Sequence, residues 1–140
     1  MDRKQVVLAA LAPAMGGTHT PVQVQKILFL IDREIPKLIG GPVFHFEPYD
    51  YGPFDKDVYD ELEALRKRGL VEVTEVRYRR YRLTDAGQEA GQKALASLGN
   101  AASNYIKNVS GFVRKLSFDQ LVSAIYKAYP EMKANSVFKG

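Results

Sequence analysis

The feature that most constrains the fold is a pair of short β-rich segments, residues 70–76 and 79–83, which directly follow a helical stretch. Only a short gap separates the two segments, and this favours a β-hairpin. Residues 55–68 carry apolar side chains at helical spacing, and Gly69 is a typical residue just beyond a helix end. We therefore expect a two-stranded flap beside the helix that precedes it.

Helical periodicity, capping residues and breakers predict further helices on both sides of this hairpin. They cover about residues 3–14, 21–35, 85–98 and 101–116, and a last helix runs from Ser117 to Pro130. The helix at 21–35 is apolar over a wide stripe, so we expect it to be central and buried. An aromatic connector, residues 42–53, follows it, with a short strand expected at 43–46.

This order of elements is that of a winged helix–turn–helix. We predict a mainly α fold with a small β-hairpin, of the α+β class. Residues 1–98 would form the winged-helix domain, and residues 99–140 a C-terminal helical extension packed on it. A chain of 140 residues is long enough for one shared core and too short for two independent ones.

Composition excludes several kinds of site. The chain has no cysteine, which rules out disulfides, thiolate zinc sites and a cysteine nucleophile. His19 and His45 are expected in loops, and neither has a second metal ligand at suitable spacing. No phosphate-binding loop, dinucleotide glycine pattern or serine elbow is present, so we expect no cofactor and no catalysis. Without a membrane-spanning stretch or signal peptide, the simplest expectation is a soluble cytoplasmic protein.

The positive charge is unevenly distributed along the chain. The formal net charge is +4, and residues 98–140 carry six basic and two acidic side chains. A second basic feature is local, with four arginines among residues 77–82. Either region could meet a polyanion.

The hairpin and the helix before it are the candidate contacts for double-stranded DNA. The hairpin would place guanidiniums on phosphates, and the helix at 55–68 would occupy the position of a recognition helix. The candidate residues are Arg77, Tyr78, Arg79, Arg80 and Arg82 of the hairpin, and Lys56, Tyr59 and Lys67 of the helix. Two considerations weigh against DNA contact by these residues. The arginines could be solvated edge charges that prevent aggregation, and residues 55–68 carry five acidic against four basic side chains.

Two stretches resemble known families. Residues 69–87, with Gly69-Leu70-Val71 and Tyr81-Arg82-Leu83-Thr84-Asp85-Ala86-Gly87, resemble the wing of PadR- and MarR-type bacterial regulators. Val24-Gln25-Lys26-Ile27-Leu28-Phe29-Leu30, followed by Tyr51-Gly52-Pro53-Phe54, is similar to the pattern of the Panacea (SocA-type antitoxin) domain and of YwgA-like proteins of phages and bacteria. The resemblance implies a transcription regulator, an antitoxin or a proteolysis adaptor.

Two hypotheses about function follow. The first is a DNA-binding winged-helix transcription regulator that dimerises through its C-terminal helices. The alternative is a protein-interaction module, such as an antitoxin or adaptor, that binds a toxin or an adaptor client. That module would use the acidic face of the helix at 55–68 or the rings of the connector, although we expect these rings chiefly to seal the core.

Overall fold

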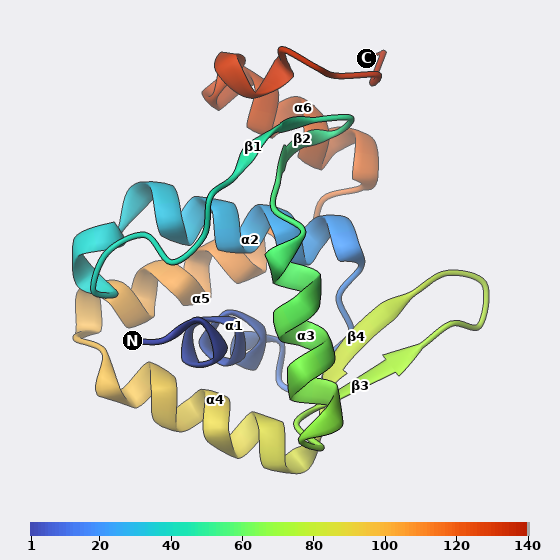
Figure 1. Ribbon diagram of the computed structural model, residues 1–140. Helices are drawn as coiled ribbons and strands as arrows, with labels where there is room; N and C mark the ends of the chain where they lie inside the picture. The colour runs from blue at the N-terminus through green and yellow to red at the C-terminus, as the bar shows by residue number, and fades with distance from the viewer. Residues whose placement is uncertain (140) are drawn as a thin grey trace.

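Helices dominate residues 1–139, the part of the chain that the computed structural model describes (Figure 1). The elements are α1 (Arg3–Leu11), α2 (Pro21–Glu34), β1 (Glu47–Tyr49), β2 (Gly52–Phe54), α3 (Asp57–Lys67), β3 (Val71–Thr74), β4 (Arg80–Leu83), α4 (Asp85–Ser97), α5 (Asn100–Arg114) and α6 (Phe118–Ala128), with short 3-10 helices η1 (Ala12–Ala14), η2 (Pro36–Leu38) and η3 (Pro130–Lys133). The predicted α+β class is confirmed. Within the described range, no helix combines the length and the apolar character that a bilayer crossing requires.

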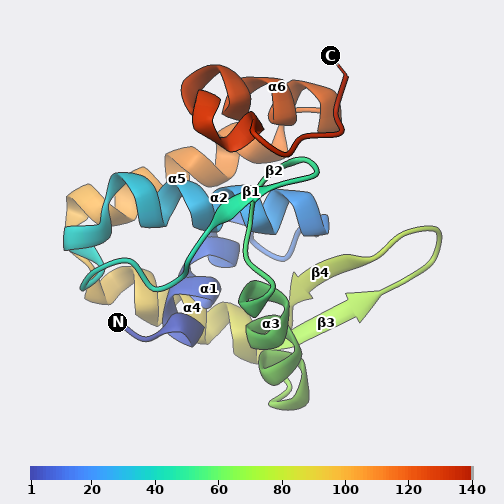
Figure 2. The same ribbon diagram turned by 45° about the horizontal axis from the view of Figure 1, so that its top comes forward.

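Helix α2 is the centre of the fold, as its apolar sequence predicts. It packs against α1 and α5 and also contacts β2, while α4 packs along α1 (Figures 1 and 2). Ile27, Leu28 and Ile31 are completely buried. The helix begins at Pro21, where Thr20 accepts a hydrogen bond from the backbone N–H of Gln23, and the Gln23 side chain accepts one from the backbone N–H of Thr20.

Two polar side chains of α2 point into the core and hold the chain that leads into α3. The side-chain Nε2 of Gln25 donates to the carbonyl of Asp55 at 2.9 Å, and the Asp55 backbone N–H donates back to Gln25 Oε1 at 3.0 Å. Lys26, only 3% exposed, donates from Nζ to the Pro53 carbonyl at 3.0 Å. Every one of these polar groups is buried and paired, so the contacts fix where α3 starts.

A third polar side chain of α2, Asp32, holds the beginning of the connector. Its two carboxylate oxygens accept the backbone N–H groups of Val43 and Phe44, each at 2.8 Å. Because these N–H groups bond a side chain, residues 43–46 form no strand, and the expectation of one there is wrong. The strands of the connector lie further on, where β1 and β2 pair antiparallel. Gln25, Lys26 and Asp32 are called the polar clamp below.

The second hairpin is present where the sequence predicts it. Strands β3 and β4 pair antiparallel, with Val71 opposite Leu83 and Thr74 opposite Arg80. On the other side of β4, the backbone of His19 pairs with Tyr81 through hydrogen bonds of 2.8 and 2.9 Å. The hairpin is thereby joined to the segment that precedes α2.

The imidazole of His19 is 1% exposed, and neither ring nitrogen has a hydrogen-bond partner. Burial, and then the positive charge of Arg114, lower the pKa of His19 to about 3. The ring is therefore neutral in the folded protein at physiological pH.

The stretch Thr84 to Gly87 connects the hairpin to α4 by close backbone contact. Thr84 Oγ1 accepts from the Gly87 backbone N–H at 3.0 Å and donates to the carbonyl of Gly69 at 2.7 Å. A Cβ atom at position 87 would lie 1.9 Å from the carbonyl oxygen of Leu70. Only glycine fits this position, which explains the threonine and glycine of the motif after β4.

The buried lysine should make the stability of the fold depend on pH. Burial lowers the pKa of Lys26 from 10.5 to about 8. Between these values the unfolded chain binds more protons than the folded one, so stability should rise by about 1–2 kcal/mol from pH 8 to pH 10. In Lys26→Met this rise should be lost, whereas the exposed control Lys37→Met should keep it. Urea unfolding at several pH values measures the difference, and equal slopes in the two variants would contradict it.

Candidate functional site

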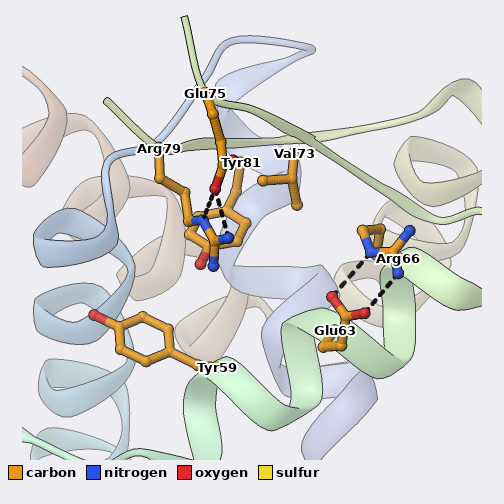
Figure 3. A pocket seen from close by; sticks show the side chains of 7 residues that line it. All are labelled: Tyr59, Glu63, Arg66, Val73, Glu75, Arg79 and Tyr81. Atoms are coloured by element: carbon orange, nitrogen blue, oxygen red, sulfur yellow. Dashed lines mark hydrogen bonds and ion pairs between the residues drawn. The ribbon is translucent and has the colours of Figure 1, made fainter. Parts of the chain in front are cut away.

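A cleft of about 530 Å³ separates α3 from the β3–β4 hairpin (Figure 3). Its lining residues come from both elements: Tyr59, Glu63 and Arg66 from α3, and Val73, Glu75, Arg79 and Tyr81 from the hairpin segment. The cleft exists because α3 is fixed at its start by the polar clamp, while the hairpin is fixed by its pairing with His19.

Part of the lining of this cleft is aromatic and apolar. Tyr81 is buried, and Tyr59 and Val73 are half-buried. Burial raises the pKa of the Tyr59 phenol, although hydrogen bonding with Gln25 acts in the opposite sense. The phenol therefore stays protonated at neutral pH and can donate or accept a hydrogen bond.

Two arginine–glutamate pairs lie on opposite sides of the cleft and neutralise it. On α3, Arg66 donates to both carboxylate oxygens of Glu63, at 2.6 and 2.9 Å. On the hairpin, Arg79 donates to Glu75 through Nε at 2.8 Å and Nη2 at 2.5 Å (Figure 3). Each guanidinium faces a carboxylate of its own element, so the cleft offers little net charge to a ligand.

Aromatic side chains extend the cleft towards the first hairpin. The Tyr59 ring meets Phe54 edge to face at 5.7 Å, and Phe54 stacks on Tyr49 at 4.9 Å. Tyr49 is 53% exposed. We call Tyr59, Phe54 and Tyr49 the aromatic ridge; it joins the cleft to the β1–β2 hairpin.

The connector rings therefore divide between two environments. Phe44 is buried, as expected for a ring that seals the core, but Tyr49 and Tyr51 are exposed. Tyr51 packs on Phe118 at the start of α6, with ring centroids 5.1 Å apart. The expectation of core packing is right for Phe44 and wrong for the two tyrosines, because Tyr51 lies in the turn between β1 and β2, at the surface, and Tyr49 directly precedes that turn.

The hairpin arginines predicted to contact DNA lie in different surroundings. Arg82 is paired with Glu72 of the facing strand at 2.7 Å, and Arg79 with Glu75. Arg80 lies over the Tyr78 ring, 4.4 Å from its centroid, donates to the Tyr78 hydroxyl, and reaches Thr18. Arg77 is exposed at the turn, with φ of 130°, and makes no ion pair within residues 1–139.

The three predicted contacts on α3 are also separated. Lys56 pairs with Asp57 and Asp60, each at 3.6 Å, at the start of the helix. Lys67 is exposed at the last residue of α3, about 16 Å away along the helix axis. Of the residues predicted to contact DNA, only Tyr59 and Arg79 line the cleft.

Sequence reasoning included the acidic face of α3 but did not predict that the arginines pair with carboxylates. Glu63 precedes Arg66 by three residues on a helix, a spacing that brings side chains together. Glu72 is opposite Arg82 in the hairpin, which follows once the register is known. The polar clamp was also missed; its signal is three polar residues within the otherwise apolar stretch 24–32 of α2.

Fold and site together define a small helical protein with a neutral, aromatic cleft suited to binding. The chain belongs to the family of antitoxin SocA-like proteins with a Panacea domain, whose family model matches residues 24–130. The match confirms this resemblance and includes both hairpins. Comparison with curated proteins found no match.

The prediction of a DNA-binding transcription regulator is wrong. The family is that of an antitoxin-like domain and matches the alternative hypothesis instead. The physical reason lies in the hairpin, where Arg79 and Arg82 are bound by Glu75 and Glu72, so much of the expected positive field is cancelled.

Neutralisation of the hairpin can be measured on an anionic matrix. Glu72→Gln combined with Glu75→Gln would release two guanidiniums and should raise the salt concentration needed for elution from heparin. Glu47→Gln combined with Asp119→Asn makes the same change in net charge away from the hairpin, at exposed carboxylates that form no ion pair within residues 1–139, and should shift elution much less. Equal shifts would show that net charge, and not the local ion pairs, controls binding.

Proposed function

We propose that this chain is an antitoxin-like module that binds a protein partner through the cleft and the aromatic ridge. The observation that carries the proposal is the combination of exposed aromatic surface with arginines whose charge is already matched. Tyrosine and arginine are the residues most enriched at the centres of protein interfaces. The role is one of binding without catalysis, and the expected partner is a toxin, in keeping with the family to which the chain belongs.

The shape of the site supports a protein partner of ordinary size. In this proposal residues 1–98 are a winged-helix unit whose hairpin and third helix form the two walls of the cleft. Residues 99–140 are an extension that holds α2 in place, since α5 packs along this helix. A projecting segment of the partner would enter the cleft, and the aromatic ridge would cover the apolar surface next to it.

Both charged pairs fit this role. Their side chains are about half exposed, so a partner can approach without desolvating an unpaired charge. The same arrangement gives no gain with a polyphosphate backbone, which needs uncompensated cations. The neutral cleft thus favours a polypeptide.

Site-specific photo-cross-linking tests the proposal. A benzophenone amino acid at position 49 should capture the partner in cells, whereas the same group at position 38, which replaces the exposed Leu38 of η2, should not. Mass spectrometry identifies the captured protein. The antitoxin role is tested by expressing the captured protein alone, which should be toxic, and together with this chain, which should relieve the toxicity.

Affinity measured with the purified partner completes the test. Tyr49→Ala should weaken binding by about 10- to 100-fold, the loss expected for a central aromatic contact. Leu38→Ala serves as the matched control and should leave binding unchanged. Equal labelling from both positions, or unchanged affinity in Tyr49→Ala, would overturn the proposed site.

A further inference from the structure

A second groove lies between η1, α4 and α5, and has a volume of about 410 Å³. Its lining includes Met15, Gln92, Leu95, Lys107, Gly111 and Arg114. None of these residues belongs to the cleft or to the aromatic ridge. The groove is therefore a separate feature of the surface.

The α5 wall of this groove carries two cations whose charge is not matched. Lys107 and Arg114 make no ion pair with any carboxylate in the described part of the chain, unlike Arg79 and Arg82 of the hairpin. The charge of Arg114 helps to lower the pKa of the buried His19. The imidazole is therefore neutral and does not offset the charge of Arg114. Lys107 and Arg114 are two helical turns apart, about 10 Å, so their long side chains can converge on one acidic group between them.

The opposite wall is apolar. Met15 is 72% exposed and holds a left-handed backbone conformation, with φ of 50°, which is uncommon for a residue other than glycine. Its sulfur accepts a weak hydrogen bond from Gln92 Nε2 at 3.3 Å, which positions the side chain above the groove. Leu95 is buried beneath it. An exposed, positioned methionine is suited to contact an apolar group.

Gly111 keeps the floor between the two cations open. It lies inside α5, where glycine costs about 0.5–1 kcal/mol relative to alanine. A Cβ atom at this position would meet no atom within 4 Å, so packing inside the protein does not require glycine. A side chain at position 111 would instead occupy the space of the groove.

We propose that this groove binds an acidic segment of a protein partner. A carboxylate side chain would lie between Lys107 and Arg114, and a neighbouring apolar side chain would pack on Met15 and Leu95. The two unmatched cations favour an anionic group, and the apolar wall favours one carried by a polypeptide over a free ion. The inference rests on the proposed function in that the partner is a protein, but it does not depend on the cleft.

Titration of the whole chain with short capped peptides tests the groove directly. The probe is acetyl-Ala-Leu-Glu-Ala-amide, and its matched control carries glutamine in place of glutamate. In two-dimensional amide NMR, the glutamate peptide should shift the signals of Gly111 and Met15 in a saturable way, and the glutamine peptide should bind at least fivefold more weakly. Equal binding of the two peptides would overturn the proposal.

Variants assign the effect to the groove. Lys107→Met and Arg114→Met should each weaken binding about twofold to fivefold, as expected for one partly screened ion pair. Lys115→Met removes the same charge from the same helix, but Lys115 lies over the Phe112 ring, outside the groove, and the variant should bind normally. Gly111→Leu should fill the groove and abolish binding while the protein stays folded, because position 111 has open space around it.

Two further arms identify the ligand class. Inorganic phosphate or a short DNA duplex that produced the same shifts at the same concentration as the glutamate peptide would show a general anion site and overturn the proposal. The peptide titration needs no partner, so its result is independent of cross-linking at Tyr49. If only the titration fails, the proposed peptide site in the groove is overturned. If only the cross-linking fails, the proposed function of the cleft is overturned.

Discussion

The polar clamp is the interaction on which the rest of the structure depends. A buried helix such as α2 offers no free backbone groups, so a connector that crosses it can be fixed only by side chains. Gln25, Lys26 and Asp32 supply them and bind backbone atoms of the connector, so the contacts are largely insensitive to its side chains. The clamp also brings together the two stretches in which the sequence resembles the Panacea domain, because Lys26 of the first contacts Pro53 of the second.

The clamp carries a cost that limits what can replace it. A lysine ammonium group buried against one carbonyl loses hydration that a single hydrogen bond does not restore, and its lowered pKa expresses this. Gly52 is a second constraint at the same place, because a Cβ atom there would lie 3.3 Å from the Tyr126 ring and 3.7 Å from Lys26. Its φ of 104° is also one that favours glycine. The position of Tyr51, and hence of the exposed end of the hairpin, follows from these contacts.

The sequence predicted the regular elements well and the site poorly, for one physical reason. Helices such as α2 and the hairpin β3–β4 follow from periodicity and from start and stop residues such as Pro21 and Gly69, which act locally. Residues 43–46 look like a strand but give their N–H groups to Asp32, a contact that no local pattern contains. Ion pairs depend in the same way on which side chains meet, and four arginines in six residues indicate a basic surface only if their partners are ignored.

The two basic regions of the chain show how pairing, rather than composition, determines the character of a surface. The hairpin has the higher density of arginine, yet Glu72 and Glu75 bind two of its guanidiniums. Helix α5 has fewer cations, but Lys107 and Arg114 form no ion pair within residues 1–139. Since exposed charges more than a Debye length apart are largely screened, each region is governed by its immediate neighbours. Two of the four hairpin arginines, Arg79 and Arg82, are thus neutralised by their neighbours, whereas neither Lys107 nor Arg114 is paired with a carboxylate in the described part of the chain.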